Sequence, residues 1–239
     1  MEIKKLMEEA LEKLENANEK IPSSPALSKP SPSDEERIAR LLKAIPNSLS
    51  AFGVPPRFIR PDLAVPESLA GVLGPNGEVE RSLCLLGGPG VGKTMAVCLL
   101  IQESLRRRAK TFPGPNWWPC PLPWKFIVYP EFIMKVQDSF KNDRGEATAY
   151  EMLEKVAKTP LLVIDDLGAE KPTEYVRQAT YYIINHREMN LLPTFITTNF
   201  SMDHLDDNID PRISSRICGM CDVVRMDGKD RRIKERRTV

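Results

Sequence analysis

The sequence predicts an open α/β fold, with a parallel five-stranded sheet flanked by helices. A glycine-rich loop, Gly87–Thr94, joins an apolar run to a helical segment, Met95–Arg108. A second apolar run, Leu161–Ile164, ends in two carboxylates. Helical stretches lie between the apolar runs, which indicates right-handed crossovers between parallel strands. The strands we expect are Ser82–Leu86, Lys125–Tyr129, Leu161–Asp165, Thr194–Thr198 and Asp222–Met226.

The loop after the first strand has the sequence GGPGVGKT. Its residues are Gly87, Gly88, Pro89, Gly90, Val91, Gly92, Lys93 and Thr94. A strand, this loop and a helix in that order are the context of a P-loop, whose backbone N–H groups bind phosphates. Lys93 is expected to reach the β- and γ-phosphates of ATP, and Thr94 to bind Mg²⁺. A chance glycine-rich turn is the alternative that this context disfavours.

The third strand continues into Asp165 and Asp166. Its apolar residues do not alternate with polar ones, which indicates a strand buried on both faces. The carboxyl end of such a strand lies at the ligand edge of an open α/β sheet, beside the P-loop. We expect Asp165 to bind Mg²⁺ and Asp166 to polarise the attacking water. Asp166 is one methylene shorter than the glutamate of many ATPases, which favours slow hydrolysis.

Two later positions are candidates for catalysis. Asn199 follows the fourth strand, where it could orient the attacking water or cap a helix. The second is the segment Pro211–Ile217, where either of two arginines could reach a neighbouring subunit and stabilise phosphoryl charge.

Composition limits the remaining possibilities. The net charge is +1, so affinity for nucleic acid must come from local patches. No apolar run approaches the ~20 residues of a membrane span, and the charged N-terminus does not resemble a signal peptide. The five cysteines form no regular framework, which favours reduced thiols and a cytoplasmic location. The pair Cys218 and Cys221 is expected in the core rather than in a metal or redox site.

The chain is expected to divide into residues 1–50 and 51–239. Residues 1–20 carry an apolar stripe at helical spacing: Ile3, Leu6, Met7, Ala10, Leu11 and Leu14. This stripe must pack on its own domain, on a second copy or on a partner. A proline- and serine-rich linker, 21–33, precedes a short helix with a Ser33–Glu36 capping box. The Phe112–Trp124 segment is either a surface excursion or an aromatic platform for nucleic acid.

From Gly53 onward the motifs GVPPRF, GGPGVGKT, LLVIDDLGAE, TTN and RISSRI follow one another. In this order they resemble the AAA+ helicase loaders of the DnaC type and the related IstB transposition ATPases. The resemblance covers about four-fifths of the chain. Because few residues follow Arg216, we expect the helical lid of most AAA+ proteins to be absent, as it is in the loaders. It implies that Asn199 is the sensor I residue and Arg216 the arginine finger, with Arg212 a second candidate. Phe140, Thr173 and Tyr175 match DNA-contacting positions, with ordinary packing as the alternative.

The resemblance therefore implies an ATPase that loads a replicative helicase onto single-stranded DNA. ATP and Mg²⁺ would bind between protomers of a homo-oligomer, and the N-terminal region would hold the helicase. Turnover would be slow and stimulated by DNA or partner. Two alternatives remain: an IstB-like ATPase that binds duplex DNA and a transposase, and a nucleotide-gated adaptor with little turnover.

Overall fold

The computed structural model describes residues 32–111, 124–140, 148–201, 204 and 209–232. The chain divides into two units, residues 1–35 and 36–239, and the sheet belongs to the second. The expected N-terminal helix, the linker and most of the Phe112–Trp124 segment lie outside the described residues.

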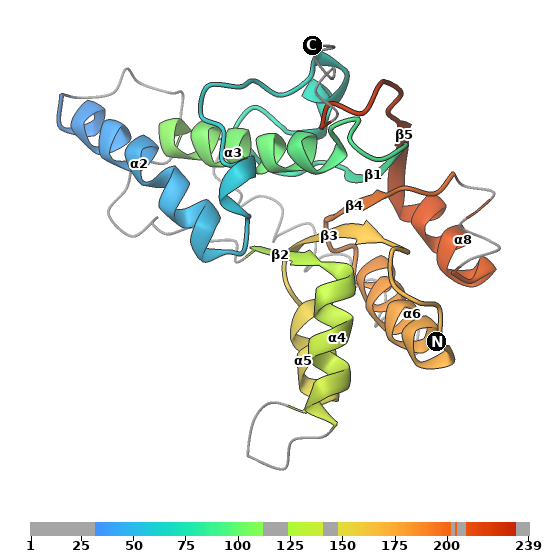
Figure 1. The fold of residues 1–239 in the computed structure, drawn as a ribbon. Helices are drawn as coiled ribbons and strands as arrows, with labels where there is room; N and C mark the ends of the chain where they lie inside the picture. Colours follow the sequence, from blue (N-terminus) through green and yellow to red (C-terminus); the bar gives the residue numbers. More distant parts are fainter. Residues whose placement is uncertain (1–31, 112–123, 141–147, 202–203, 205–208, 233–239) are drawn as a thin grey trace, which may run out of the picture. The chain divides into compact units, whose positions relative to one another are not determined.

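A five-stranded parallel sheet forms the centre of this unit, in the order β2-β3-β4-β1-β5 (Figure 1). The strands are β1 Ser82–Leu86, β2 Trp124–Val128, β3 Leu161–Leu167, β4 Thr194–Thr198 and β5 Cys221–Arg225. The predicted fold class is thus confirmed, and β1 and β4 have the predicted bounds. Because β4 lies between β3 and β1, the carboxyl ends of these three strands meet at one edge.

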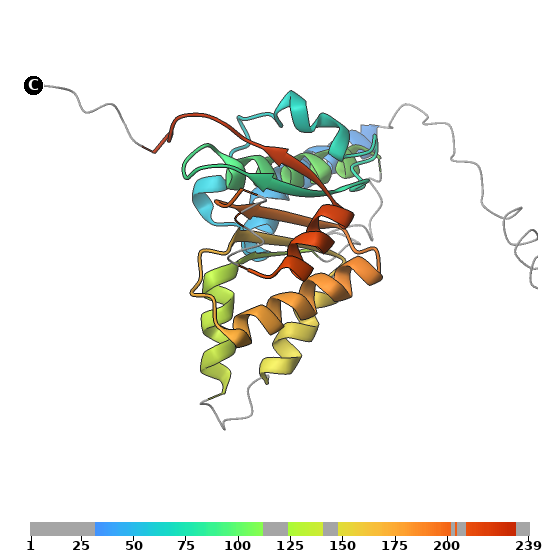
Figure 2. The same cartoon turned by 90° about the vertical axis from the view of Figure 1, so that its right-hand side faces the viewer.

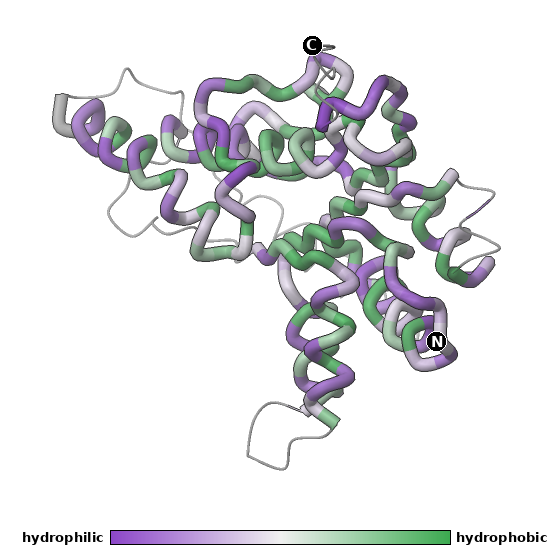
Figure 3. Tube along the Cα trace, viewed as in Figure 1, coloured by the Kyte–Doolittle hydropathy of each residue, from purple (hydrophilic) through white to green (hydrophobic). Residues whose placement is uncertain are grey.

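Helices cover both faces of the sheet (Figures 1 and 2). Along β1, Leu83 and Leu85 pack with α2 and α3, while Cys84 and Leu86 pack with the helices of the opposite face. Successive side chains of a strand point to opposite faces, so an unbroken apolar run fills two cores at once. Figure 3 accordingly shows the strands as mainly hydrophobic segments.

The helices differ from the prediction mainly in length. They are α2 Pro32–Ala51, α3 Lys93–Thr111, α4 Tyr129–Ser139, α5 Ala149–Ala157, α6 Glu174–Met189 and α8 Pro211–Met220, with short 3-10 turns at Pro56–Phe58 and Glu67–Val72. The short helix expected after the linker is the longer α2. Its extension carries Ile45 and Leu49, which are buried in the core beside α3.

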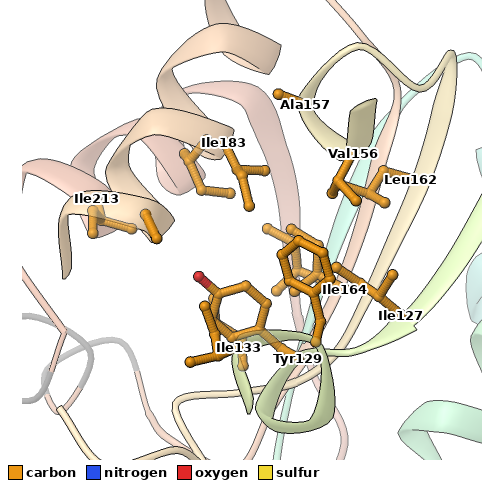
Figure 4. Close-up of a cluster of buried hydrophobic side chains, with 14 of the residues drawn as sticks. Ile127, Tyr129, Ile133, Val156, Ala157, Leu162, Ile164, Ile183 and Ile213 are labelled. Atoms are coloured by element: carbon orange, nitrogen blue, oxygen red, sulfur yellow. The ribbon is translucent and has the colours of Figure 1, made fainter. Parts of the chain in front are cut away.

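Figure 4 shows the core on the other face, where Ile127, Tyr129 and Ile164 meet Ile183 of α6. The Tyr129 hydroxyl is fully buried and lies 2.6 Å from the Thr180 hydroxyl, so its polar atom has a partner. Burial raises the pKa of Tyr129 above its ordinary value. Across the described ranges, no helix is both long enough and apolar enough to span a membrane.

Candidate nucleotide-binding site

The P-loop lies between β1 and α3, as expected. Gly87, Gly90 and Gly92 have φ angles of 150°, 74° and 109°, which residues with a side chain rarely adopt. These conformations explain the glycines of the motif. The loop leads directly into α3, so the first N–H groups of that helix also face the loop.

Lys93 and Asn199 are joined across the strand ends. The Lys93 ammonium donates hydrogen bonds to the carbonyls of Gly87 and Gly88, at 2.6 and 2.8 Å, and to Asn199 Oδ1 at 2.8 Å. Burial lowers the pKa of Lys93, and the carboxylates of Asp166 and Asp165 oppose this shift. Because the Lys93 ammonium is now held by two backbone carbonyls and Asn199, a bound phosphate would replace the carbonyls. It would also change the contact between Lys93 and Asn199.

Asp165 lies at the centre of a second network. Its Oδ1 accepts hydrogen bonds from the hydroxyls of Thr94, at 2.9 Å, and Thr197, at 2.7 Å. Burial raises the pKa of Asp165 to about 6, and the two threonine hydroxyls oppose the rise. A carboxylate and a hydroxyl at this distance are the hard oxygen ligands that Mg²⁺ prefers. Thr94 and Asp165 thus fit a magnesium ion, which would supply charge neutralisation for phosphates.

Asp166 has a strained backbone. Its φ is 56°, which is unusual for a residue with a side chain, and its N–H donates to the Thr197 hydroxyl at 2.9 Å. The pairing of β3 with β4 shifts register between Ile164 and Leu167, so Asp166 lies within an irregularity of the strand. Its side chain lines the cleft beside the P-loop.

That cleft has a volume of about 560 Å³, within the range of small-molecule sites. Lys93, Thr94, Asp166 and Asn199 all line it, so the structure brings these predicted site residues together. The cleft is also lined by residues that were not predicted as part of the site: Arg57, Phe58, Arg60, Leu63, Met95, Arg231 and Arg232. The GVPPRF motif contains Arg57 and Phe58, and Arg231 and Arg232 are adjacent in the sequence, but neither pattern shows by itself that it reaches the P-loop.

Arg216 does not line this cleft within its own subunit. Its guanidinium contacts α6, where Nε lies 3.0 Å from Asn185 Oδ1 and 3.2 Å from Glu188 Oε2, and Nη2 donates to the Tyr181 hydroxyl at 3.0 Å. Arg212, the second candidate, is more exposed and pairs with Asp210 at 2.8 Å. Both guanidinium groups lie over the ring of Tyr181.

The candidate DNA-contacting residues form a separate group. Phe140 follows α4 with 62% of its surface exposed, and its ring meets that of Tyr175 edge to face at 5.2 Å. Thr173 caps α6, because its side chain accepts a hydrogen bond from the Val176 N–H at 3.3 Å. Phe140 and Tyr175 therefore make one aromatic surface, whereas the Thr173 hydroxyl already has a structural partner.

The cysteine pair divides between core and surface. Cys221 is buried, as expected, but Cys218 is exposed, so the expectation of core packing holds for only one of the two. In the part of the chain that the structure describes, no three histidine, cysteine or acidic residues gather in a way that could hold a metal ion.

The comparisons with known proteins agree with this geometry. The replicative helicase loader DnaI of Bacillus subtilis is 31% identical over 166 residues, 64% of this chain and 48% of the relative. The helicase loader DnaC of Escherichia coli is 22% identical over 136 residues, 57% of this chain and 49% of the relative. A crystal structure of DnaI matches with a TM-score of 0.50 and 26% identity, over 69% of this chain and 79% of that one.

The chain is similar to the helicase loaders DnaI and DnaC and has an AAA+ P-loop fold. No protein-family model matches it. The chain spans about half the length of the curated relatives it matches. DnaI and DnaC are both named as replicative helicase loaders.

Proposed function

We propose that this AAA+ protein is an ATP-dependent loader that places a replicative helicase on single-stranded DNA. The observation that carries the proposal is the joining of Lys93, Thr94, Asp165 and Asn199 at one strand edge, in a chain related to DnaI. DnaI and DnaC are named as replicative helicase loaders, which favours this activity over transposition.

The P-loop N–H groups and Lys93 would bind the phosphates of ATP. Thr94 and Asp165 would hold Mg²⁺. Asp166 and Asn199 would orient the attacking water from either side of Thr197, whose hydroxyl fixes both Asp165 and the backbone of Asp166. Because Lys93 donates to Asn199, a change at the phosphate would be transmitted to the end of β4.

Arg216 would complete the site of a neighbouring subunit in a homo-oligomer. To do so it must exchange its hydrogen bonds to Asn185 and Tyr181 and its ion pair with Glu188. The Arg216 side chain is 27% exposed and that of Glu188 36%, and ion pairs this exposed contribute about 0–1 kcal/mol. A phosphate that carries several negative charges is a stronger partner for a guanidinium.

DNA would bind at the exposed ring of Phe140 and the half-buried ring of Tyr175 beside it. An aromatic ring offers a stacking surface to any base, so this contact suits binding without sequence preference. Thr173 has the matching position in the family pattern, but its hydroxyl caps α6, so we assign its DNA contact to the backbone or to a rearranged side chain.

The helicase would bind the N-terminal apolar stripe of residues 3–14. An amphipathic helix ahead of a proline-rich linker is a common form of tethered binding segment. A carboxylate in its apolar face, as in Leu11→Asp, would be desolvated without a partner on binding.

A loading assay tests the proposal. The full-length protein, the replicative helicase of its host, circular single-stranded DNA and ATP are combined, and helicase bound to DNA is measured after gel filtration. We expect Lys93→Ala to abolish loading because ATP no longer binds. Leu11→Asp should also abolish loading but leave ATP binding intact. Equal loading without ATP, or no association between wild-type protein and helicase, would contradict the proposal.

One observation favours a second candidate, a nucleotide-gated adaptor with little turnover. Asp166 replaces a longer glutamate and is held by a strained backbone, so the attacking water can be poorly placed. Phosphate release measured with and without single-stranded DNA separates the two functions. Turnover that stays at background while ATP binds would favour the adaptor.

A further inference from the structure

The segment that follows β5 runs beside the P-loop (Figure 1). The Met226 N–H donates to the Leu86 carbonyl at 2.7 Å, and the Met226 carbonyl lies against Gly87. Further along, the Arg231 N–H donates to the Gly90 carbonyl at 3.1 Å. We call residues 226–232 the C-terminal strap, because backbone contacts fix it to the P-loop at two points.

Asp230 closes a turn in the strap, next to the backbone contact between Arg231 and Gly90. Its Oδ1 accepts the Arg232 N–H at 2.9 Å, which forms a tight turn. The same carboxylate lies directly over Gly90, where any side chain on that glycine would collide with it. Gly90 is therefore required both by its positive φ and by the passage of the strap.

The turn places two arginines on the cleft beside the P-loop. Arg231 and Arg232 line the same cleft as Lys93 and Thr94. The Nη1 atom of Arg231 lies 3.7 Å from the position that a Cβ atom on Gly92 would occupy. The charge of Arg232 is among the causes that lower the pKa of Lys93, after burial, so this guanidinium lies within electrostatic reach of the P-loop lysine.

The four arginines of the cleft differ in their partners. Arg60 pairs with Asp62 at 2.6 Å, and Arg57 lies over the ring of Phe58. Within the described ranges, no ion pair or side-chain hydrogen bond is formed by Arg231 or Arg232. Two unpaired guanidinium groups beside a P-loop suit an anionic ligand with several oxygens, since each can donate two parallel hydrogen bonds to phosphate.

We propose that Arg231 and Arg232 bind the phosphates of the nucleotide held by the P-loop of the same subunit. This inference rests on the proposed nucleotide site and adds two phosphate ligands to it. It differs from the role of Arg216, because the strap arginines belong to the same subunit and act before any oligomer forms.

The test compares two double variants of the full-length protein. Arg231→Ala/Arg232→Ala removes both guanidinium groups from the cleft. Arg225→Ala/Lys229→Ala removes two positive charges from β5 and the strap, but both residues are exposed and neither lines the cleft. The binding of a fluorescent ATP analogue is titrated with each variant at low and high salt, and melting curves establish that each is folded.

We expect the cleft variant to lose about tenfold in ATP affinity for each arginine removed, the usual scale of a charged hydrogen bond. The control variant should bind within about twofold of wild type, because exposed charges outside the cleft are screened. ATP binding by the cleft variant should also depend less on salt. Arg231→Lys/Arg232→Lys retains both charges, so its ATP affinity should lie between those of the cleft variant and the control variant. This lysine variant also provides the test if the alanine variant does not fold.

Wild-type affinity in the cleft variant, or an equal loss in both variants, would overturn the proposal. Tighter ATP binding by the cleft variant would also overturn it and would show that the strap obstructs the cleft. These outcomes leave the P-loop site intact. If the wild-type protein itself binds no ATP, the nucleotide site and the strap proposal are both wrong.

Discussion

The two ends of α6 hold their candidate functional groups in different ways. Near its first turn, Tyr175 meets Phe140 only through a ring contact, and Phe140 is 62% exposed. In its second half, Tyr181, Asn185 and Glu188 surround the guanidinium of Arg216 with hydrogen bonds and an ion pair. In the proposed function, a base would reach the exposed Phe140 ring without rearrangement, whereas Arg216 would first have to exchange its partners.

This difference predicts which activity depends on assembly. A DNA-binding surface that is already exposed should act in a single subunit. An arginine that is paired within its own subunit should act only when a neighbour presents a stronger partner. ATP hydrolysis should therefore require the oligomer, while weak binding of single-stranded DNA should not.

The largest effect is expected for Arg216→Ala. Arginine fingers contribute about 10³–10⁵ to the rate of phosphoryl transfer, so this variant should lose most of its DNA-stimulated ATP hydrolysis. The measurement is phosphate release from an equal mixture of Arg216→Ala and Lys93→Ala subunits. The mixture should regain activity, because some interfaces combine an intact P-loop with an intact arginine.

Arg212→Ala provides the comparison for that experiment. The family pattern matches Arg216 first and Arg212 only second, so the loss of Arg212, which pairs with Asp210, should have a much smaller effect on hydrolysis. A larger loss of ATP hydrolysis with Arg212→Ala than with Arg216→Ala would identify Arg212 as the arginine finger. A mixture as inactive as its parents, with both parents still oligomeric, would exclude action in trans.

Features carried by short motifs could be predicted from the sequence, whereas contacts between distant segments could not. Short contiguous motifs such as GGPGVGKT and LLVIDD can be placed from the sequence. Each follows or ends a strand, and the carboxyl ends of parallel strands meet at one edge of the sheet, so the two motifs are predicted to lie together. The partners of Arg216 on α6, and the approach of Arg231 to Gly90, join segments far apart in the sequence. No local pattern marks such contacts, so they depend on the packing of α8 against α6 and on the path taken after β5.

A smaller effect is expected for Phe140→Ala. Stacking on an aromatic ring contributes about 1–3 kcal/mol per base, so the affinity for single-stranded DNA should fall about tenfold while ATP affinity is retained. Met134→Ala is the matched control, because Met134 is 64% exposed on α4, the helix that precedes Phe140, but has no aromatic ring. Fluorescence anisotropy with a labelled oligonucleotide measures both. Equal DNA affinity in wild type and Phe140→Ala would show that Phe140 does not bind DNA and only packs at the surface.

The smallest effect is expected for Tyr175→Phe, which separates the ring from the hydroxyl. The Tyr175 hydroxyl is buried and has no hydrogen-bond partner among the described residues, and burial raises the pKa of this group. Removing an unpaired buried hydroxyl relieves a cost of about 1–3 kcal/mol at most, so the melting temperature should stay the same or rise. The ring contact with Phe140 remains, so DNA affinity should stay within about twofold of wild type if stacking is the interaction. A loss as large as that of Phe140→Ala would instead show that the hydroxyl turns outward to a DNA phosphate, and the aromatic end of α6 would then rearrange on binding as the Arg216 end does.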